Sequence, residues 1–139
     1  MKRGIFYVLA VLVALLFIGM LIPVSGPRSA GEMVMCRLEE SDINTAMVQF
    51  KIKYDSYPTG ENSHIVRALA GDNPQKIVFL DFRRSAEHPN EMVDPWETPY
   101  QIEFSKQTNF VIRSAGKDKI FGDADDIVFN SASNDFVKP

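Results

Sequence analysis

Residues 94–127 read DPWETPYQIEFSKQTNFVIRSAGKDKIFGDADDI, and this stretch decides the fold. Two segments within it, 100–104 and 109–113, alternate β-branched or aromatic residues with polar ones, which is the pattern of a half-buried strand. The polar residues 105–108 between them are a turn signal. The sequence therefore predicts an antiparallel hairpin, to which residues 127–129 add a short edge strand.

Upstream of the hairpin, a helical pattern replaces the strand pattern. Between residues 31 and 55, apolar side chains recur every three to five residues, which predicts one long amphipathic helix. Its expected apolar stripe consists of Met35, Leu38, Ile43, Met47, Phe50 and Tyr54. Its expected outer faces carry Glu39, Glu40, Asp42, Lys51 and Lys53.

The segments between this helix and the hairpin complete an α+β fold. A Tyr-Pro-Thr-Gly turn at 57–60 ends the long helix, and a short helix is expected over 63–70, with Gly71 after it. Residues 76–82, KIVFLDF, read as a further strand. We predict that the long helix buries its stripe on one face of a small antiparallel β-sheet.

Residues 5–24 read IFYVLAVLVALLFIGMLIPV and contain no formally charged side chain. A helix of this length, at ~1.5 Å per residue, spans about 30 Å, which is the thickness of a bilayer's hydrocarbon core. Because Lys2 and Arg3 precede the segment, the positive-inside rule predicts a cytoplasmic N-terminus and an exported remainder. A retained transmembrane helix is the favoured interpretation, and a secretory signal cleaved after Gly26 is the alternative.

These patterns divide the 139 residues into four parts. The parts are a basic leader (1–4), a transmembrane helix (5–24), a break or kink (25–30) that contains Gly26 and Pro27, and one globular domain (31–139). The formal net charge of −3 argues against a nucleic-acid binder, which usually carries a basic excess. The single cysteine, Cys36, excludes an intramolecular disulfide, and its place in the helix predicts a buried, unreactive thiol.

Residues 114–127 form an acidic segment that contains two glycines, Gly116 and Gly122. Its aspartates are Asp118, Asp123, Asp125 and Asp126. Ca²⁺ takes about six to eight oxygen ligands from carboxylates, carbonyls and water, and glycines let backbone carbonyls turn inward. The ligand order of an EF-hand is absent. On chemistry alone, the segment fits a calcium loop and a solvated acidic turn equally well.

Two motifs and the order of the parts resemble the type IV pilin superfamily, most closely the major pseudopilin of type II secretion systems. That family carries an Asp-Pro-Trp-x-x-Pro-Tyr stretch, followed by a Gly-rich acidic loop that binds Ca²⁺. The stretch is matched here by Asp94, Pro95, Trp96, Pro99 and Tyr100. In the acidic loop, Asp118 and one of the Asp125–Asp126 pair match the family's aspartates.

The residues of these motifs have expected roles. The length of the loop before the hairpin indicates that its own side chains hold it, and Asp94, Pro95, Trp96 and Tyr100 are the expected anchor. Trp96 is interpreted as a plug of the core, and a ligand-stacking role is the alternative. The candidate ligands of a structural Ca²⁺ are Asp118, Asp123, Asp125 and Asp126. Prepilin peptidase would remove the leader after Gly4, so that Ile5 becomes the methylated N-terminus of the mature chain.

The resemblance also implies a function. The chain would be a structural, pseudopilin-like subunit of a type II secretion or type IV pilus-type filament, anchored in the bacterial inner membrane with its domain in the periplasm. Its partners would be other pseudopilin subunits and the inner-membrane platform of the secretion system, and assembly would drive protein export. No nucleotide-binding, nucleophile-elbow or zinc-protease motif is present in the sequence, and we do not expect an enzyme.

One departure from the family keeps a second function open. Family members usually have Phe after the cleaved glycine and Glu five residues into the mature chain, whereas this sequence has Ile5 and Leu9. That glutamate is thought to neutralise the N-terminal amine of a neighbouring subunit. The alternative is therefore a non-assembling, membrane-anchored periplasmic binding or scaffold module with the same pilin-like fold.

Overall fold

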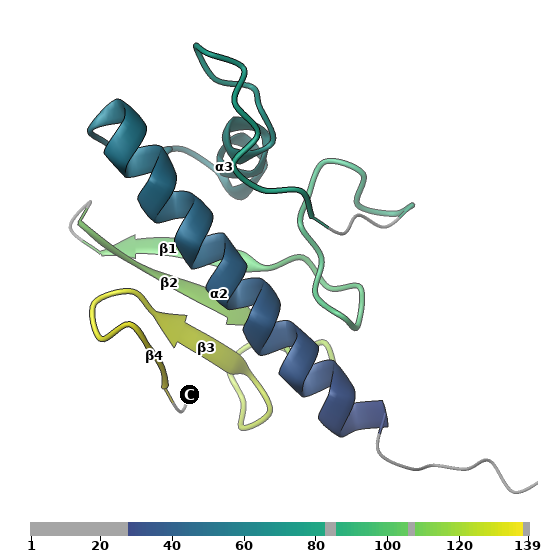
Figure 1. Cartoon of the computed structure of the whole chain (residues 1–139). Helices are drawn as coiled ribbons and strands as arrows, with labels where there is room; N and C mark the ends of the chain where they lie inside the picture. The colour runs from purple at the N-terminus through teal and green to yellow at the C-terminus, as the bar shows by residue number, and fades with distance from the viewer. Residues whose placement is uncertain (1–27, 83–85, 106–107, 138–139) are drawn as a thin grey trace, which may run out of the picture.

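The structure, a computed structural model, describes residues 28–82, 86–105 and 108–137 (Figure 1). Its elements are the helices α2 (Arg28–Tyr54) and α3 (Asn62–Leu69) and the strands β1 (Gln101–Ser105), β2 (Asn109–Ser114), β3 (Ile127–Asn130) and β4 (Asp135–Val137). The four strands form one antiparallel sheet in the order β1-β2-β3-β4, and α2 lies along one face of it. The α+β class and the long helix on a small antiparallel sheet are confirmed.

The N-terminal predictions fall largely outside the described residues. The leader, the segment 5–24 and residues 25–27 are among them. Residues 28–30, which we predicted as part of the break, are helical, because α2 begins at Arg28. Within 28–82, 86–105 and 108–137, no helix is both long enough and apolar enough to cross a membrane.

The predicted hairpin is confirmed, and one side of it faces α2. In the register of the sheet, Ile102, Ile112, Phe129 and Phe136 form one row across all four strands. The first three of these side chains are buried in the core shared with α2, and Phe136 packs against it. The segment 127–129 is a strand as predicted, and it pairs with β2. It is not an edge strand, because β4 pairs with its other side.

The predicted strand over residues 76–82 is wrong. This segment pairs with no strand in the described part of the chain, and it is held to α3 instead. The Phe79 and Leu80 amides both donate to the Leu69 carbonyl, at 2.8 and 3.2 Å. Asn73 fixes its start, because the Asn73 side chain bonds both the amide and the carbonyl of Ile77. Side-chain and helix-end acceptors thus replace a strand partner.

The buried face of α2 differs in phase from the stripe that the sequence predicted. Ile43, Met47 and Phe50 are buried as expected, and Tyr54 packs against the core. Met35 and Leu38 are 46% and 62% exposed, so their assignment to the stripe is wrong. The buried face continues instead through Cys36 and Glu40. Glu40 comes four residues after Cys36 and three before Ile43, which is the spacing of residues on one face of a helix.

Neighbouring residues of α2 give a direct test of this packing. Met47 is fully buried, whereas Val48 is 38% exposed. Met47→Ala should lower the free energy of unfolding by about 2–5 kcal/mol, because it leaves a cavity in the core. Val48→Ala should change it by no more than about 0.5 kcal/mol. Urea denaturation of the full-length chain in mild detergent measures both, and equal losses would contradict the assigned face.

Candidate metal centre

The candidate centre is the loop of residues 115–126, which connects β2 to β3. Gly116 has φ +68°, and a Cβ at this position would lie 2.4 Å from the Asp125 carbonyl oxygen and 2.7 Å from Asp125 Oδ2. No side chain fits there without moving the loop. Gly122 also has a left-handed backbone, with φ +100°. The two glycines let the loop curl back on itself, so that its aspartates approach one another.

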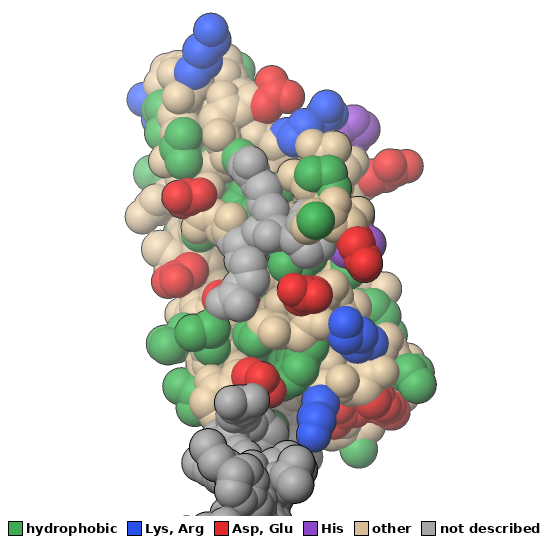
Figure 2. All heavy atoms as spheres, turned by 90° about the vertical axis from the view of Figure 1, so that its right-hand side faces the viewer, with side chains coloured by type: hydrophobic (Ala, Val, Ile, Leu, Met, Phe, Trp, Pro, Cys, Tyr) green, Lys and Arg blue, Asp and Glu red, His purple; other side chains and the backbone are tan. Residues whose placement is uncertain are grey.

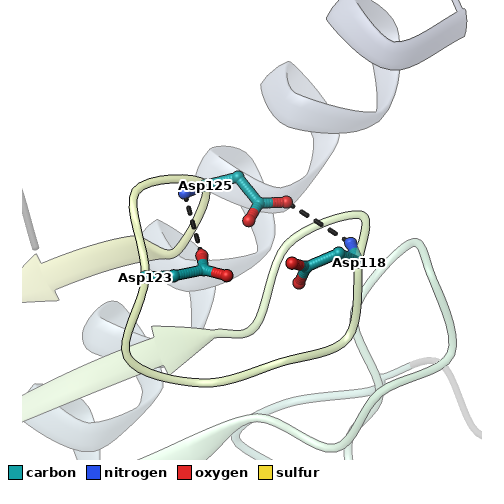
Figure 3. Close-up of side chains that lie close together, drawn as sticks. All are labelled: Asp118, Asp123 and Asp125. Carbon is teal, nitrogen blue, oxygen red and sulfur yellow. Dashed lines mark hydrogen bonds between the residues drawn. The ribbon is translucent and has the colours of Figure 1, made fainter.

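The loop brings Asp118, Asp123 and Asp125 together, as Figure 3 shows. One carboxylate oxygen from each of them lies within 4.8 Å of the others. Because Ca²⁺ binds oxygen at ~2.3–2.6 Å, two ligands of the same ion stand at most about 5 Å apart. The spacing of the three carboxylates therefore fits a shared divalent cation.

Backbone amides orient these carboxylates. Asp125 Oδ2 accepts from the amides of Lys117 and Asp118 at 3.0 and 3.3 Å. Asp118 Oδ1 accepts from the Ile120 amide at 2.8 Å, and Asp123 Oδ1 accepts from the Asp125 amide at 3.1 Å. Each carboxylate is thus positioned by the chain of the loop itself.

The close approach of the carboxylates shifts their pKa values. The hydrogen bond between the side chains of Asp123 and Asp125 and the nearby Asp118 carboxyl together raise the pKa of Asp123 to about 6. The same bond lowers the pKa of Asp125. A cation bound between these carboxylates would neutralise the negative charge that raises the pKa of Asp123.

Asp126, the fourth aspartate of the sequence prediction, lies outside this group. Its buried side chain faces the base of the loop, where Asp126 Oδ2 accepts from Arg113 Nη1 and from the Gly122 amide, both at 2.9 Å. Asp126 Oδ1 has no hydrogen-bond partner among the described residues. Asp126 therefore fixes the loop to β2 rather than joining the three carboxylates.

The Asp94 side chain connects the preceding loop to this one. Asp94 is fully buried, and its Oδ1 accepts from the amides of Trp96 and Thr98, both at 2.9 Å. Its Oδ2 accepts from Ser114 Oγ at 2.6 Å, and Ser114 Oγ in turn accepts from the Gly116 amide at 3.1 Å. Burial raises the pKa of Asp94, and these hydrogen bonds partly offset the effect.

Two of the other three predicted anchor residues, Trp96 and Tyr100, bond to α2. Trp96 is half-buried and packs against the core, and its Nε1 donates to Glu32 Oε2 at 3.0 Å. The Tyr100 hydroxyl donates to Glu39 Oε2 at 2.7 Å. Pro95 lies in a turn in which the Glu97 amide donates to the Asp94 carbonyl at 2.9 Å. The predicted processing residues, Gly4 and Ile5, lie outside the described residues.

The predicted position of Glu40 is also wrong. We expected it on an outer face of the helix, but it is fully buried beneath Ser114 and Asp94. Neither of its carboxyl oxygens has a hydrogen-bond partner among the described residues. Burial raises the pKa of Glu40 to about 9, so its carboxyl is neutral at pH 7. Its helical phase, four residues after Cys36 and three before Ile43, is the signal that identifies it.

Cys36 is buried as the sequence predicts. The residue is fully inaccessible, and burial raises the pKa of its thiol to about 12. The Tyr100 hydroxyl also lies 3.5 Å from Cys36 Sγ. Because the thiolate is the reactive form of cysteine, this residue is chemically inert.

Comparisons with known proteins identify one family. The family model described as "Type II secretion system (T2SS), protein G" matches residues 25–130. This span is well over half of the chain, and it includes both helices, β1 to β3 and the aspartate loop. The comparisons with curated proteins and with solved structures gave no significant match. The family match confirms the resemblance that the DPWETPY stretch and the acidic loop indicate.

The burial of Glu40 predicts how stability depends on pH. Native Glu40 keeps its proton up to about pH 9, whereas the unfolded chain releases it near the ordinary value of 4.5. The native state therefore binds more protons between these values, and the free energy of unfolding falls as the pH rises. Glu40→Gln should remove this contribution, which reaches about 1.4 kcal/mol per pH unit.

Urea denaturation at several values between about pH 5 and 8 measures the effect. Exposed Glu103→Gln on β1 is the matched control and should leave the pH dependence of wild type unchanged. Parallel curves for wild type and Glu40→Gln would show that Glu40 is ionised in the native state.

Proposed function

The chain belongs to the type II secretion system protein G family, and we propose that it is a structural pseudopilin subunit whose assembly into a periplasmic filament drives protein export. The family is one of structural secretion subunits, which places the chain in a role related to type II secretion. The observation that carries the proposal is the match over residues 25–130, with a long helix packed on a small antiparallel sheet.

The N-terminal segment supplies the anchor in this proposal. Residues 5–24 are uncharged and long enough to span the inner membrane as one helix. In the mature chain they would pack beside the same segments of other pseudopilin subunits, because an apolar helix is as stable in a bundle of its copies as in lipid. Prepilin peptidase would cleave after Gly4, and the inner-membrane platform of the secretion system would hold the growing filament.

Leu9 supports a second candidate function, that of a membrane-anchored periplasmic module that does not assemble. In a filament, the amine of Ile5 would lie in an apolar core, and Leu9 offers no carboxylate to neutralise it. An unpaired charge in such surroundings is costly. The N-terminus of the mature protein therefore distinguishes the two candidates.

We also propose that the loop of residues 115–126 binds a structural Ca²⁺. Asp118, Asp123 and Asp125 would be its carboxylate ligands, since their oxygens have the spacing that one ion requires. The bound ion would neutralise three carboxylates that otherwise repel one another. Asp126 and the chain of bonds through Asp94 and Ser114 hold the two ends of the loop in place for it.

The mass of the N-terminal peptide tests the filament proposal. In protein purified from its native membrane, we expect the chain to begin at Ile5 and to carry a methyl group on its amine. A chain that begins at Met1 or Lys2 would reject prepilin processing and favour the non-assembling module. A chain that begins near Pro27 would reject the anchor itself.

Thermal unfolding of the full-length protein tests the calcium proposal. At a Ca²⁺ concentration of about 100 times the dissociation constant, binding stabilises the native state by about 2.7 kcal/mol. For a domain of this size, that raises Tm by on the order of 10 °C over the value in chelator. Asp118→Ala should abolish this difference, because it removes one of the three ligands.

Asp135→Ala is the control for this experiment. Asp135 is an exposed aspartate on β4, outside the group of three, so its variant should keep the full calcium-dependent increase. Equal Tm values for wild type in Ca²⁺ and in chelator would overturn the metal proposal.

A further inference from the structure

The loop of residues 115–126 has a tip that combines basic and apolar side chains. We name residues 117–121 the loop tip. Lys117, Lys119 and Ile120 are exposed, and the exposed fraction of Ile120 is 61%. Lys119 has a left-handed backbone with φ +65°, and the Ile120 amide donates to Asp118 Oδ1 at 2.8 Å. The turn therefore holds an apolar side chain in water next to two ammonium groups.

The loop tip lies at the end of the domain where α2 begins. The ring centroids of Tyr57, which follows the C-terminal end of α2, and Phe110, near the start of β2, are 5.3 Å apart. Ser114, at the end of β2, lies beside Glu40 in the first half of α2. β2 therefore runs toward the N-terminal end of α2, and the loop continues beyond it (Figure 1). In Figure 2, basic, acidic and hydrophobic side chains lie together at the lower right of the molecule, at this same end.

This end of the domain is close to the membrane in the proposed function. Only residues 25–27 separate the uncharged segment 5–24 from α2. Since consecutive Cα atoms are about 3.8 Å apart, the chain from residue 24 to Arg28 spans at most about 15 Å. When residues 5–24 cross the membrane, α2 therefore begins within about 15 Å of the hydrocarbon core, and the headgroups take up about 5–8 Å of that distance. The loop tip is on the side of the domain that faces the headgroups.

The formal charge around the loop tip changes sign when calcium binds. The two positive charges of Lys117 and Lys119 stand against the three negative charges of Asp118, Asp123 and Asp125. Asp126 adds nothing to this balance, because it is paired with an arginine of β2 at 2.9 Å. The net formal charge is therefore −1 without the ion and +1 with it. Anionic phospholipid headgroups repel the first form and attract the second.

From these observations we propose that, with Ca²⁺ bound, the loop tip rests on anionic phospholipid headgroups at the periplasmic surface of the membrane that anchors the chain. Lys117 and Lys119 contact phosphate groups, and Ile120 enters the boundary between headgroups and acyl chains. The proposal rests on the proposed function, because it needs both the anchor and the calcium site. Two lysines and one isoleucine bind a membrane weakly on their own, and the anchor in the same membrane supplies the effective concentration that they need.

A polarity-sensitive fluorophore on the loop tip tests the contact. Full-length Ile120→Cys is reconstituted in vesicles and labelled from outside, so that the fluorophore replaces the apolar side chain; Cys36 does not react, because it is fully buried. In vesicles of mixed phosphatidylglycerol and phosphatidylcholine, Ca²⁺ should shift the emission to shorter wavelength, and chelator should reverse the shift. Ser133→Cys is the control and should show no shift. Ser133 is exposed in the turn between β3 and β4, which the bond from the Ser131 amide to the Phe110 carbonyl places at the other end of the sheet.

Removal of charge tests the electrostatic part of the contact. Lys117→Gln combined with Lys119→Gln, in the labelled chain, should lower the equilibrium constant for contact about 25-fold, which is about fivefold for each lysine. Lys51→Gln combined with Lys53→Gln is the matched control, because it removes the same charge from exposed positions in the last turn of α2, and it should leave the contact unchanged. A Ca²⁺-dependent shift of the same size in both pairs of variants, or in vesicles of phosphatidylcholine alone, would overturn the proposal.

Two further measurements separate this proposal from those on which it rests. Thermal unfolding in detergent, with and without Ca²⁺, tests the calcium site, and flotation with vesicles in chelator tests the anchor. If Ca²⁺ raises Tm and the chain floats, but the emission does not shift, the lipid contact is wrong and both earlier proposals stand. If Ca²⁺ leaves Tm unchanged, or the chain does not float, the proposed calcium site or the proposed anchor is wrong, and the lipid contact is wrong with it.

Two other causes of an emission shift give results of their own. A Ca²⁺-dependent shift in detergent micelles without lipid would show a rearrangement within the loop. A shift that grows with the number of chains per vesicle would show that the loop tip contacts a second copy. Either result would overturn the lipid contact.

Discussion

The buried carboxylate of Asp94 is the interaction on which the acidic loop depends. It accepts two backbone amides from its own turn and the hydroxyl of Ser114 at the end of β2. Through Ser114 it reaches the Gly116 amide, at the first turn of the loop. A carboxylate can satisfy three donors at once, which an apolar or amide side chain cannot do. The DPWETPY stretch and the aspartate loop therefore form one structural unit.

The buried carboxylate of Asp94 affects the protonation of a second buried carboxyl group, that of Glu40. A carboxyl group without a hydrogen-bond partner lies in the same region as the carboxyl of Asp94, and burial keeps Glu40 protonated. Two buried carboxylates could not both be ionised so close together without a large penalty. Among the described residues Asp94 accepts three hydrogen bonds, whereas burial is the largest effect on Glu40 and raises its pKa to about 9, so the charge belongs on Asp94. Because Glu40 is protonated, it does not repel the ionised Asp94 carboxylate that holds the two loops together.

The sequence predicted the parts of the fold whose signal is local. The hairpin, the loop aspartates and the helix lengths follow from alternation, glycine and turn residues that lie within a few positions of one another. The strand over 76–82 failed because its amides find acceptors on α3, which no local pattern reveals. Asp125 and Asp126 are adjacent aspartates that the sequence does not distinguish, and Arg113 on β2, together with the Gly122 amide, gives Asp126 a different role.

The misplaced stripe of α2 has a different cause, because this helix carries apolar residues on two faces. Met35 and Leu38 extend a plausible stripe, yet the inward face passes through Cys36 and Glu40. A helix that needs only to cover a sheet would carry charged residues on its outer side. In α2 the outer side instead carries the exposed apolar residues Val34, Leu38, Val48 and Ile52 at helical spacing. The sequence of this helix therefore contains two apolar stripes, and only the contacts with the sheet show which of them is buried.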